Sequence, residues 1–510
     1  MNQSGGSSVG NAGHAGGERT FLGHPLGLYG LFFTEMWERF SFYSMRAFLV
    51  LYMTKAMSFA PGHSNEVYGA YLGFVYAAPF LGGILADRLL GQRRCIVIGG
   101  ILMAAAQFTL ATHAWLIRDQ AGTAPVEQSI AITSIFFLGL GMLSAGNGFF
   151  KPNISSIVGS LYEQGDPRRD GAFTIFYMGI NIGAFAAGFS GQLAEKYGWH
   201  WGFVLAGAGM LIGQVIFSGT THLLHGRGMP PAKAASAASS NAGIPKGVLV
   251  ALGVILFMPV AGYLMANPKY VQNLALFVAV PVMIYLLWET FRGTPEERGR
   301  MLVIIILCCF SIMFWAFFEL AGSAINLFTD AHVDRNVPIF GELKASLLTA
   351  SINPLFIIIL GFPFAKLWVW LDKRRMEPSS PLKFALGLTQ LGAGFFIMYL
   401  GAAQAGTTGK CNISFLVLGF MLHTTGELCL SPVGLSTITK LSPARMVSTF
   451  MGVWFLSSSL GNVFGGWVGS RTEHYGFDVV FKYIALTAVA SGVLLFLLVP
   501  VLKKMMHGVK

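Results

Sequence analysis

Long apolar stretches, each about the length of a membrane crossing, follow one another along almost the whole chain of 510 residues. A straight helical crossing takes about 20 residues, whereas the alternating apolar and polar residues of a membrane β-barrel are absent. The pattern predicts an all-α polytopic membrane protein with fourteen transmembrane helices, at residues 26–57, 66–88, 93–117, 129–160, 170–195, 200–223, 246–266, 271–291, 300–330, 342–371, 381–404, 413–440, 444–472 and 479–504.

Polar segments between the apolar stretches divide the chain into domains. An acid followed by bases after the second helix (Asp87, Arg88) is echoed after the tenth (Asp372, Lys373), which indicates two duplicated six-helix bundles. Two extra helices, preceded by a flexible linker rich in Ala, Ser and Pro, separate the bundles. The predicted domains are a disordered cytoplasmic tail (1–24), an N-terminal six-helix bundle (25–225), a linker with two additional helices (226–298), a C-terminal six-helix bundle (299–505) and a cytoplasmic tail (506–510).

Composition supports a membrane protein, because 54% of the residues are hydrophobic and only 11% are charged, against roughly 25% charged in soluble domains. The net charge of +11 does not indicate a nucleic-acid partner. Most Lys and Arg fall in segments that share one side of the membrane if both termini are cytoplasmic, as the positive-inside rule predicts. We therefore expect a multi-pass plasma-membrane protein in contact with the lipid bilayer, and the compact loops favour a bacterial inner membrane.

The first predicted helix carries an unusual set of polar residues within an otherwise apolar run. Glu35, Glu38, Arg39, Tyr43 and Arg46 fall within about 140° of one helical face. Charge at membrane depth costs roughly 3 kcal/mol per residue on insertion scales, so it is seldom kept without a function. For Glu35 and Arg39 two interpretations remain open, namely proton handling and a structural pair within the helix.

Three further ionisable residues, Lys151, Glu319 and Glu427, are predicted at membrane depth. Together with Arg39 and Arg46 they place cations in the first half of the chain and acids in the second. This set suits a zwitterion, whose carboxylate needs a cation and whose ammonium needs an anion. Neither a nucleophile–base pair nor metal-ligand spacing is found, so the sequence predicts a protein that is not an enzyme and has no metal site.

Four motifs lie in the first, fourth, fifth and twelfth predicted helices. They are Glu35-x-x-Glu38-Arg39-Phe40, Gly148-Phe-Phe-Lys151-Pro152-Asn153, Phe176-Tyr177-Met178-Gly179-Ile180-Asn181-Ile182-Gly183 and Glu427-Leu-Cys-Leu-Ser431-Pro432-Val433-Gly434-Leu435-Ser436. Together these motifs resemble those of the proton-dependent oligopeptide transporter family, and the loop at residues 83–94 resembles the cytoplasmic motif of the major facilitator superfamily. The resemblance covers about residues 25–500 and implies a major-facilitator-type fold, with two six-helix bundles plus two extra helices.

The resemblance implies proton-coupled uptake of di- and tripeptides by alternating access, with protons as the coupling ion and no cofactor. It implies that Arg46 and Lys151 hold the peptide carboxylate and that Glu427 holds the ammonium. Proton coupling is assigned to Glu35, Glu38, Arg39 and Glu319, with Glu319 alternating between pairing with Arg46 and being protonated, and Lys151 with Glu427 as a second exchangeable pair. The other residues that the resemblance places at the substrate are Tyr43, Tyr76, Asn181, Trp315, Asn353, Ser431, Trp454 and Phe455.

Two other functions remain open at this point. A transporter on the same fold would carry nitrate or another small solute, although a simple anion does not need Glu427. A peptide-sensing receptor would need a sizeable cytoplasmic signalling domain, and the predicted tails are short. Phe42 and Ser44 depart from the family pattern, which commonly has Tyr and Gly there, so we expect selectivity to differ at this point. A monomer is expected, because the transport path lies within one chain.

Overall fold

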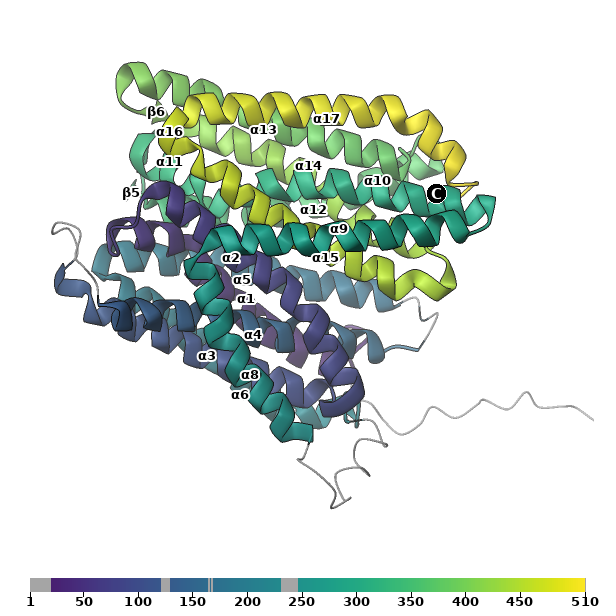
Figure 1. The fold of residues 1–510 in the computed structure, drawn as a ribbon, viewed down its shortest axis with the longest axis horizontal. Coiled ribbons are helices and arrows are strands. Elements are labelled where there is room, and N and C mark those ends of the chain that lie inside the picture. Colours follow the sequence, from purple (N-terminus) through teal and green to yellow (C-terminus); the bar gives the residue numbers. More distant parts are fainter. Residues whose placement is uncertain (1–19, 121–128, 164–165, 167, 231–245, 510) are drawn as a thin grey trace, which may run out of the picture.

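Nearly all of the chain that can be described is helical. The computed structural model describes residues 20–120, 129–163, 166, 168–230 and 246–509 (Figure 1). The long helices of the first half are α1 (Leu26–Lys55), α2 (Pro61–Leu85), α3 (Gln92–Leu116), α4 (Ile130–Ser160), α5 (Arg168–Tyr197) and α6 (Trp199–Thr220). Those of the second half are α10 (Pro295–Phe318), α12 (Ala345–Lys373), α13 (Ser380–Thr408), α14 (Ile413–Leu441), α15 (Val447–Ser470) and α17 (Phe477–Met505), and the pair between the halves is α8 (Lys246–Ala266) and α9 (Pro268–Arg292).

Short elements join or extend these helices. The helical ones are η1 (Ala86–Leu90), η2 (Arg118–Gln120), η3 (Thr221–Leu224), η4 (Glu319–Gly322), α11 (Ala324–His332), η5 (Ala444–Met446) and α16 (Thr472–Tyr475). Two-residue strands form three small pairs, made from β1 (Thr20–Phe21) with β2 (His24–Pro25), β3 (Val333–Asp334) with β6 (Cys411–Asn412), and β4 (Asn336–Val337) with β5 (Gly341–Glu342). The first pair covers the end of the predicted N-terminal tail, whereas residues 1–19 and the linker residues 231–245 lie outside the described part.

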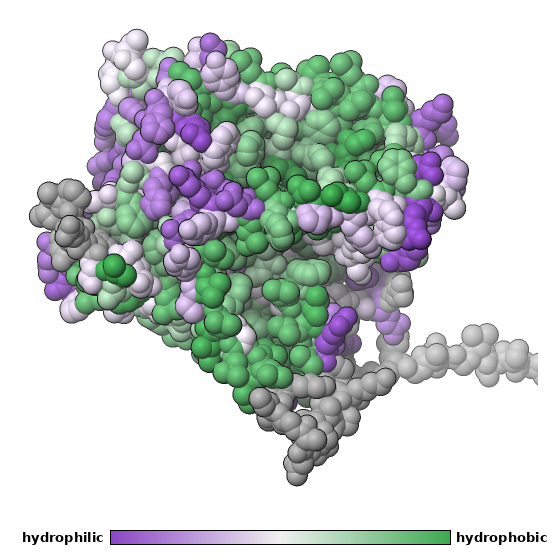
Figure 2. Space-filling view, viewed as in Figure 1, coloured by the Kyte–Doolittle hydropathy of each residue, from purple (hydrophilic) through white to green (hydrophobic). Residues whose placement is uncertain are grey.

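The fourteen long helices confirm the predicted all-α fold. Length and composition alone make twelve of them candidate membrane spans, and α1 and α15 are the two that fall short. Charges between Glu35 and Arg46 lower the hydropathy of α1, and Ser and Gly residues lower that of α15. Both helices pack among others, α1 against α5 and α6 and α15 against α2 and α10. Figure 2 shows the outer surface that results, largely hydrophobic across its middle and hydrophilic toward its left and right ends.

One predicted helix is not continuous. The apolar run at 300–330 predicts a single helix, but α10 ends at Phe318, the 3-10 turn η4 follows, and Ser323 has a non-helical backbone (φ −127°, ψ −99°) before α11 begins. Gly322 lies against the ring and hydroxyl of Tyr68, where a larger residue would collide. The break therefore brings Glu319 and the start of α11 close to the first bundle.

The hydrophobic core is divided between the two halves, with one cluster built mainly from α1–α6 and a second from α10–α17. Of the two extra helices, α8 packs mainly on α4, whereas α9 contacts α10 and α15 of the second bundle and α2 of the first. In Figure 1, α8 runs obliquely across the N-terminal half while α9 runs along the C-terminal half. The pair α8 and α9 thus spans the seam between the bundles.

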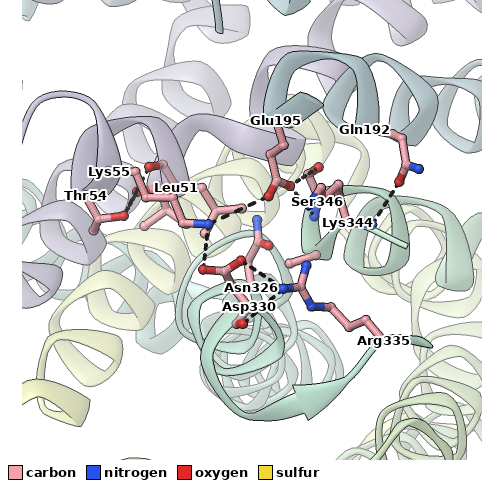
Figure 3. Close-up of polar contacts among 12 residues, drawn as sticks. Leu51, Thr54, Lys55, Gln192, Glu195, Asn326, Asp330, Arg335, Lys344 and Ser346 are labelled. Atoms are coloured by element: carbon pink, nitrogen blue, oxygen red, sulfur yellow. Dashed lines mark hydrogen bonds and ion pairs between the residues drawn. The ribbon is translucent and has the colours of Figure 1, made fainter. Parts of the chain in front are cut away.

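The bundles are joined by polar contacts at one end. We call the side where α1 begins and α17 ends the terminal side, and the opposite side the far side. On the far side, Lys55 of α1 pairs with Asp330 of α11 at 2.7 Å and approaches Glu195 of α5 at 3.8 Å (Figure 3). Ser346 of α12 donates to Glu195 through its backbone N–H (3.1 Å) and its hydroxyl (2.5 Å), and Arg335 approaches Asp330 at 3.5 Å. This network closes the far side.

Candidate functional site

A cavity of about 270 Å³, lined by charged side chains as well as apolar ones, lies between the two bundles. Helices α1, α2, α4 and α5 contribute to one wall, and α10, η4, α12, α14 and α15 contribute to the other. Tyr177 and Phe455 line the cavity and are 42% and 38% exposed, whereas Glu319 at its inner end is 5% exposed. The cavity is therefore open toward the terminal side and closed toward the far side.

The cavity gathers fourteen of the fifteen residues that the sequence placed at the site. Those that line it are Glu35, Arg39, Tyr43, Arg46, Tyr76, Lys151, Asn181, Trp315, Glu319, Asn353, Glu427, Ser431, Trp454 and Phe455. The exception is Glu38, which is fully buried behind the cavity wall. The structure thus brings together residues from both halves, and their individual roles remain predictions.

An ion pair between Arg46 and Glu319 links α1 to η4 across the bundles. The Nε of Arg46 also donates to the hydroxyl of Tyr68 at 2.6 Å, and the hydroxyl of Tyr76 donates to Glu319 Oε1 at 3.4 Å. The guanidinium lies 5.5 Å from the ring centre of Tyr43. Because the two charges are almost out of contact with solvent, their attraction is screened less than that of a surface pair. This pair is therefore suited to hold the far side closed.

Within α1, Arg39 pairs with both acids of the first motif. Its Nη2 donates to Glu38 Oε1 at 2.6 Å, its Nε contacts the other oxygen of Glu38, and Glu35 Oε1 lies 3.3 Å from that nitrogen. The internal pair of Glu35 and Arg39 that the sequence suggested is present, and Glu38 adds a second acid. Glu35 Oε2 is buried and has no hydrogen-bond partner among the described residues. One carboxylate oxygen thus stays available for a proton or a water molecule.

Lys151 and Glu427 lie on opposite walls of the cavity. Lys151 Nζ sits 4.8 Å from the ring centre of Tyr76, a cation–π contact, and no ion pair between Lys151 and Glu427 forms within the described part of the chain. Glu427 accepts a hydrogen bond from Asn353 Nδ2 at 2.9 Å, and Thr424 accepts another from the same nitrogen at 3.0 Å. The cavity therefore presents a cation and an anion that do not neutralise each other.

Aromatic and amide side chains fill the remaining wall. Trp315 has a buried indole N–H without a partner among the described residues, so this donor is available to a bound molecule. Trp454 packs edge to face on Phe384 with ring centres 6.2 Å apart. Asn181 donates to the backbone carbonyl of Tyr177, which leaves its side-chain oxygen free to accept a hydrogen bond.

Sequence reasoning missed one residue that lines the cavity and one that lies behind its wall. His423 lines it from α14 and is 1% exposed, with its ring against Phe395 at 4.7 Å. Tyr68 lies behind Arg46, and its hydroxyl accepts a hydrogen bond from Arg46 Nε. His423 precedes Glu427 by four residues, so helical spacing alone puts both on one face and is the signal that could have found it.

Comparison with known proteins decides the family. The sequence model of the POT family matches residues 93–480. The chain belongs to the POT family. It is 37% identical to the peptide transporter YePEPT of Yersinia enterocolitica, with 96% of this chain and 97% of that protein covered. It is 31% identical to the di-/tripeptide transporter of Lactococcus lactis subsp. cremoris, with 97% and 99% covered.

Solved structures of POT members share the whole architecture. A crystal structure of a peptide transporter POT in complex with sulfate superimposes with a TM-score of 0.80 at 34% identity, covering 96% of this chain and 98% of that one. A POT family transporter in complex with 5-aminolevulinic acid gives a TM-score of 0.80 at 26% identity, covering 95% and 98%. The predicted family and the major-facilitator-type fold are confirmed. The protein is therefore a multi-pass membrane transporter of the peptide-transport family and not an enzyme.

Proposed function

We propose that this protein is a proton-coupled symporter that imports di- and tripeptides across a bacterial inner membrane. The observation that carries this proposal is the cavity between the bundles, with Arg46 and Lys151 on one wall and Glu427 on the other. Free peptides of any sequence share a carboxylate and an ammonium, so a cavity with fixed charges of both signs can recognise them without reading the side chains.

Recognition divides between the two bundles. In this proposal Arg46 and Lys151 bind the peptide carboxylate, and Tyr43 and Asn181 add hydrogen bonds. Glu427 binds the ammonium with Asn353 holding the carboxylate in place, while Trp315, Trp454 and Phe455 surround the side chains, with Tyr76 and Ser431 completing the wall. At about 270 Å³ the cavity is close to the lower limit of about 300 Å³ typical of ligand pockets, which suits a short peptide better than a long one.

Coupling rests on the pair of Arg46 and Glu319. If both termini are cytoplasmic, the terminal side is the inside and the conformation is inward-facing. Protonation of Glu319, or binding of the peptide carboxylate to Arg46, removes one charge of the pair and so weakens the contact that joins the bundles on the far side. Glu35, Glu38 and Arg39 serve as a second proton site linked to Lys151. A monomer is sufficient, since the whole path lies in one chain.

Uptake into liposomes tests the function as a whole. The purified protein should accumulate a labelled dipeptide when the lumen is alkaline relative to the outside, and accumulation should vanish when an ionophore collapses the proton gradient. Unlabelled tripeptide should compete, whereas free amino acid, nitrate and tetrapeptide should not. Accumulation that persists without a proton gradient, or competition by nitrate alone, would contradict the proposal.

Replacing Tyr68 with Phe should weaken transport with little effect on folding. The substitution removes the hydroxyl that accepts a hydrogen bond from Arg46 Nε, and a hydrogen bond to a charged group contributes about 1.5–3 kcal/mol. We expect dipeptide uptake to fall by about tenfold. Tyr71→Phe is the matched control on the same helix, because the Tyr71 hydroxyl is buried without a partner in the described structure. Equal losses in the two variants would show that the effect is only structural.

Replacing Lys55 with Met should shift the protein toward the outward-open state. Lys55 joins α1 to Asp330 on the far side, but its side chain is 41% exposed, so the contact contributes no more than about 1 kcal/mol. Distances between spin labels on the far ends of α1 and α11 should therefore show a several-fold larger open population. Lys410→Met, an exposed lysine on the same side, serves as the control, and unchanged distances in Lys55→Met would argue against a gate here.

A further inference from the structure

A second, apolar groove lies on the outside of the N-terminal bundle, away from the peptide cavity. Its volume is about 490 Å³, and it runs between α2, α4 and α8. All of its lining residues are Ala, Gly, Leu, Ile, Val or Phe. Those that matter below are Leu85 and Leu89 near η1, Gly148 on α4, and Val250, Gly253 and Val254 on α8.

The groove exists because α8 approaches α4 closely at only one end. Toward the far side, Gly141 lies against the carbonyl of Met258, and Gly262 lies so near the carbonyl of Phe137 that an added Cβ would come within 2.6 Å of it. Toward the terminal side the helices diverge, and a Cβ added to Gly253 would meet no atom within 4 Å. The result is a wedge-shaped space that opens sideways from the membrane-spanning part of the fold.

Hydrocarbon is the occupant that this space favours. Water needs two or more polar partners in a cavity, and this lining offers only apolar side chains and helical backbone. An apolar cavity of about 150 Å³ already admits benzene, so the groove is large enough for a longer chain. Since α2 and α8 are both candidate membrane spans, bilayer lipid has direct access. The segment at 231–245 before α8 consists mostly of Ala, Ser and other small residues, which fill a wide apolar groove poorly.

The terminal end of the groove adjoins a cluster of bases. Arg88, Arg93 and Arg94 fall within the eight residues 87–94, which contain one acid, Asp87. Arg88 directly precedes Leu89 of the groove, and both Arg88 and Arg94 are exposed. Arg93 points away from this surface, because its Nε donates a hydrogen bond to the backbone carbonyl of Arg227 at 2.6 Å. Guanidinium groups bind phosphate in a bidentate manner, so this end suits a phosphate headgroup.

We propose that the groove between α2, α4 and α8 binds one acyl chain of an anionic phospholipid, whose headgroup lies against Arg88 and Arg94. The site gives α8 a function that the peptide cavity does not require. The lipid site does not depend on which solute is transported. A negative peptide-uptake assay would therefore not contradict the lipid site, and a negative lipid-labelling experiment would not contradict peptide transport.

Photo-crosslinking with lipid tests the groove directly. The full-length protein is reconstituted with phosphatidylglycerol that carries a diazirine on its acyl chain, and labelled residues are mapped by mass spectrometry. We expect Val250 and Val254 to be labelled, and Gly253→Leu to reduce that labelling at least fivefold, because Leu fills the groove without collision. Gly247→Leu is the matched control, since Gly247 also faces open space but does not line the groove. Leu252 and Leu256, which are 53% and 67% exposed, report ordinary surrounding lipid and should be labelled equally in all variants.

The headgroup is tested by changing the lipid and the bases. Phosphatidylglycerol should label Val250 several-fold more than phosphatidylcholine with the same chain, and the double variant Arg88→Gln, Arg94→Gln should remove that preference. Thermal unfolding of each variant, followed in the same lipid, verifies that it is folded. The proposal is overturned if Gly253→Leu is labelled like the wild type, if the two lipids label Val250 equally, or if Val250 and Val254 are unlabelled in the folded wild type because another occupant fills the groove.

Discussion

Replacing Glu319 with Gln is expected to abolish accumulation of dipeptide against its gradient while exchange of labelled for unlabelled peptide continues. Gln keeps the size and the hydrogen-bonding ability of the side chain but cannot carry or release a proton. The variant therefore mimics a permanently protonated Glu319 and uncouples peptide movement from the proton gradient. The geometric basis is the ion pair with Arg46, which links η4 to α1 across the seam between the bundles.

How well the Glu319→Gln variant binds peptide depends on the contacts that Arg46 keeps after the substitution. Removing one partner of a buried ion pair leaves the other charge uncompensated, at a cost of about 3–5 kcal/mol. Arg46 keeps its hydrogen bond to Tyr68, and a bound peptide carboxylate supplies the missing anion, so binding of peptide should be retained or strengthened.

Accumulation and exchange are measured in the same liposomes, with and without an imposed proton gradient. Glu296→Gln is the control, because Glu296 is a 55% exposed acid that pairs only with Arg300 on its own helix among the described residues. Uphill uptake by Glu319→Gln at the wild-type level would remove Glu319 from the coupling mechanism. Loss of both accumulation and exchange would assign it to binding instead.

The sequence was sufficient to predict the site residues that carry a charge within an otherwise apolar helix. Lys151, Glu319 and Glu427 stand out because charge in an apolar helix is expensive, and the structure brings all three to one cavity. The helices were equally readable, since a membrane span is a local property of about 20 residues.

The parts that could not be predicted depend on contacts between distant segments. The break at η4 lies in an apolar run without proline, and the close approach of Tyr68 from α2 to Gly322 there is a contact between distant segments. The same holds for the far-side pair of Lys55 with Asp330, because charged residues at helix ends are common and their sequence does not show which of them meet. The groove beside α8 forms where α8 and α4 diverge, and no local sequence pattern predicts that divergence. His423 is the exception, since its spacing from Glu427 was visible.

Replacing Glu427 with Gln is expected to remove the ability to distinguish a free amino terminus from a blocked one. In the wild type, acetylating the amino terminus of a dipeptide deletes the ammonium that Glu427 is proposed to bind. A hydrogen bond between charged groups contributes about 1.5–3 kcal/mol, so acetylation should lower the apparent affinity by about 10- to 100-fold. Glu427→Gln should lower the affinity for the free dipeptide by a similar factor, and acetylation should then have little further effect.

Changes at the other end of the peptide make this test specific. Amidation of the carboxyl terminus removes the charge assigned to Arg46 and Lys151, which lie on the opposite wall from Glu427. Glu427→Gln should therefore remain sensitive to amidation, whereas Lys151→Gln should lose part of that sensitivity, because Arg46 remains, and keep its full response to acetylation. Thr425→Val is the matched control on α14. The Thr425 hydroxyl donates a hydrogen bond to the backbone carbonyl of Leu422, and Thr425 does not line the cavity.

The crossed pattern separates recognition from a general loss of fit. A variant that only disturbs packing weakens all four peptides, free, acetylated, amidated and doubly blocked, by one common factor. Selective loss of one discrimination identifies which wall reads which terminus, because the free energies of two modifications far apart on the ligand add unless they share a partner. If Glu427→Gln still discriminates against the acetylated peptide as the wild type does, the ammonium binds elsewhere, and Glu427 serves only to hold Asn353 in position.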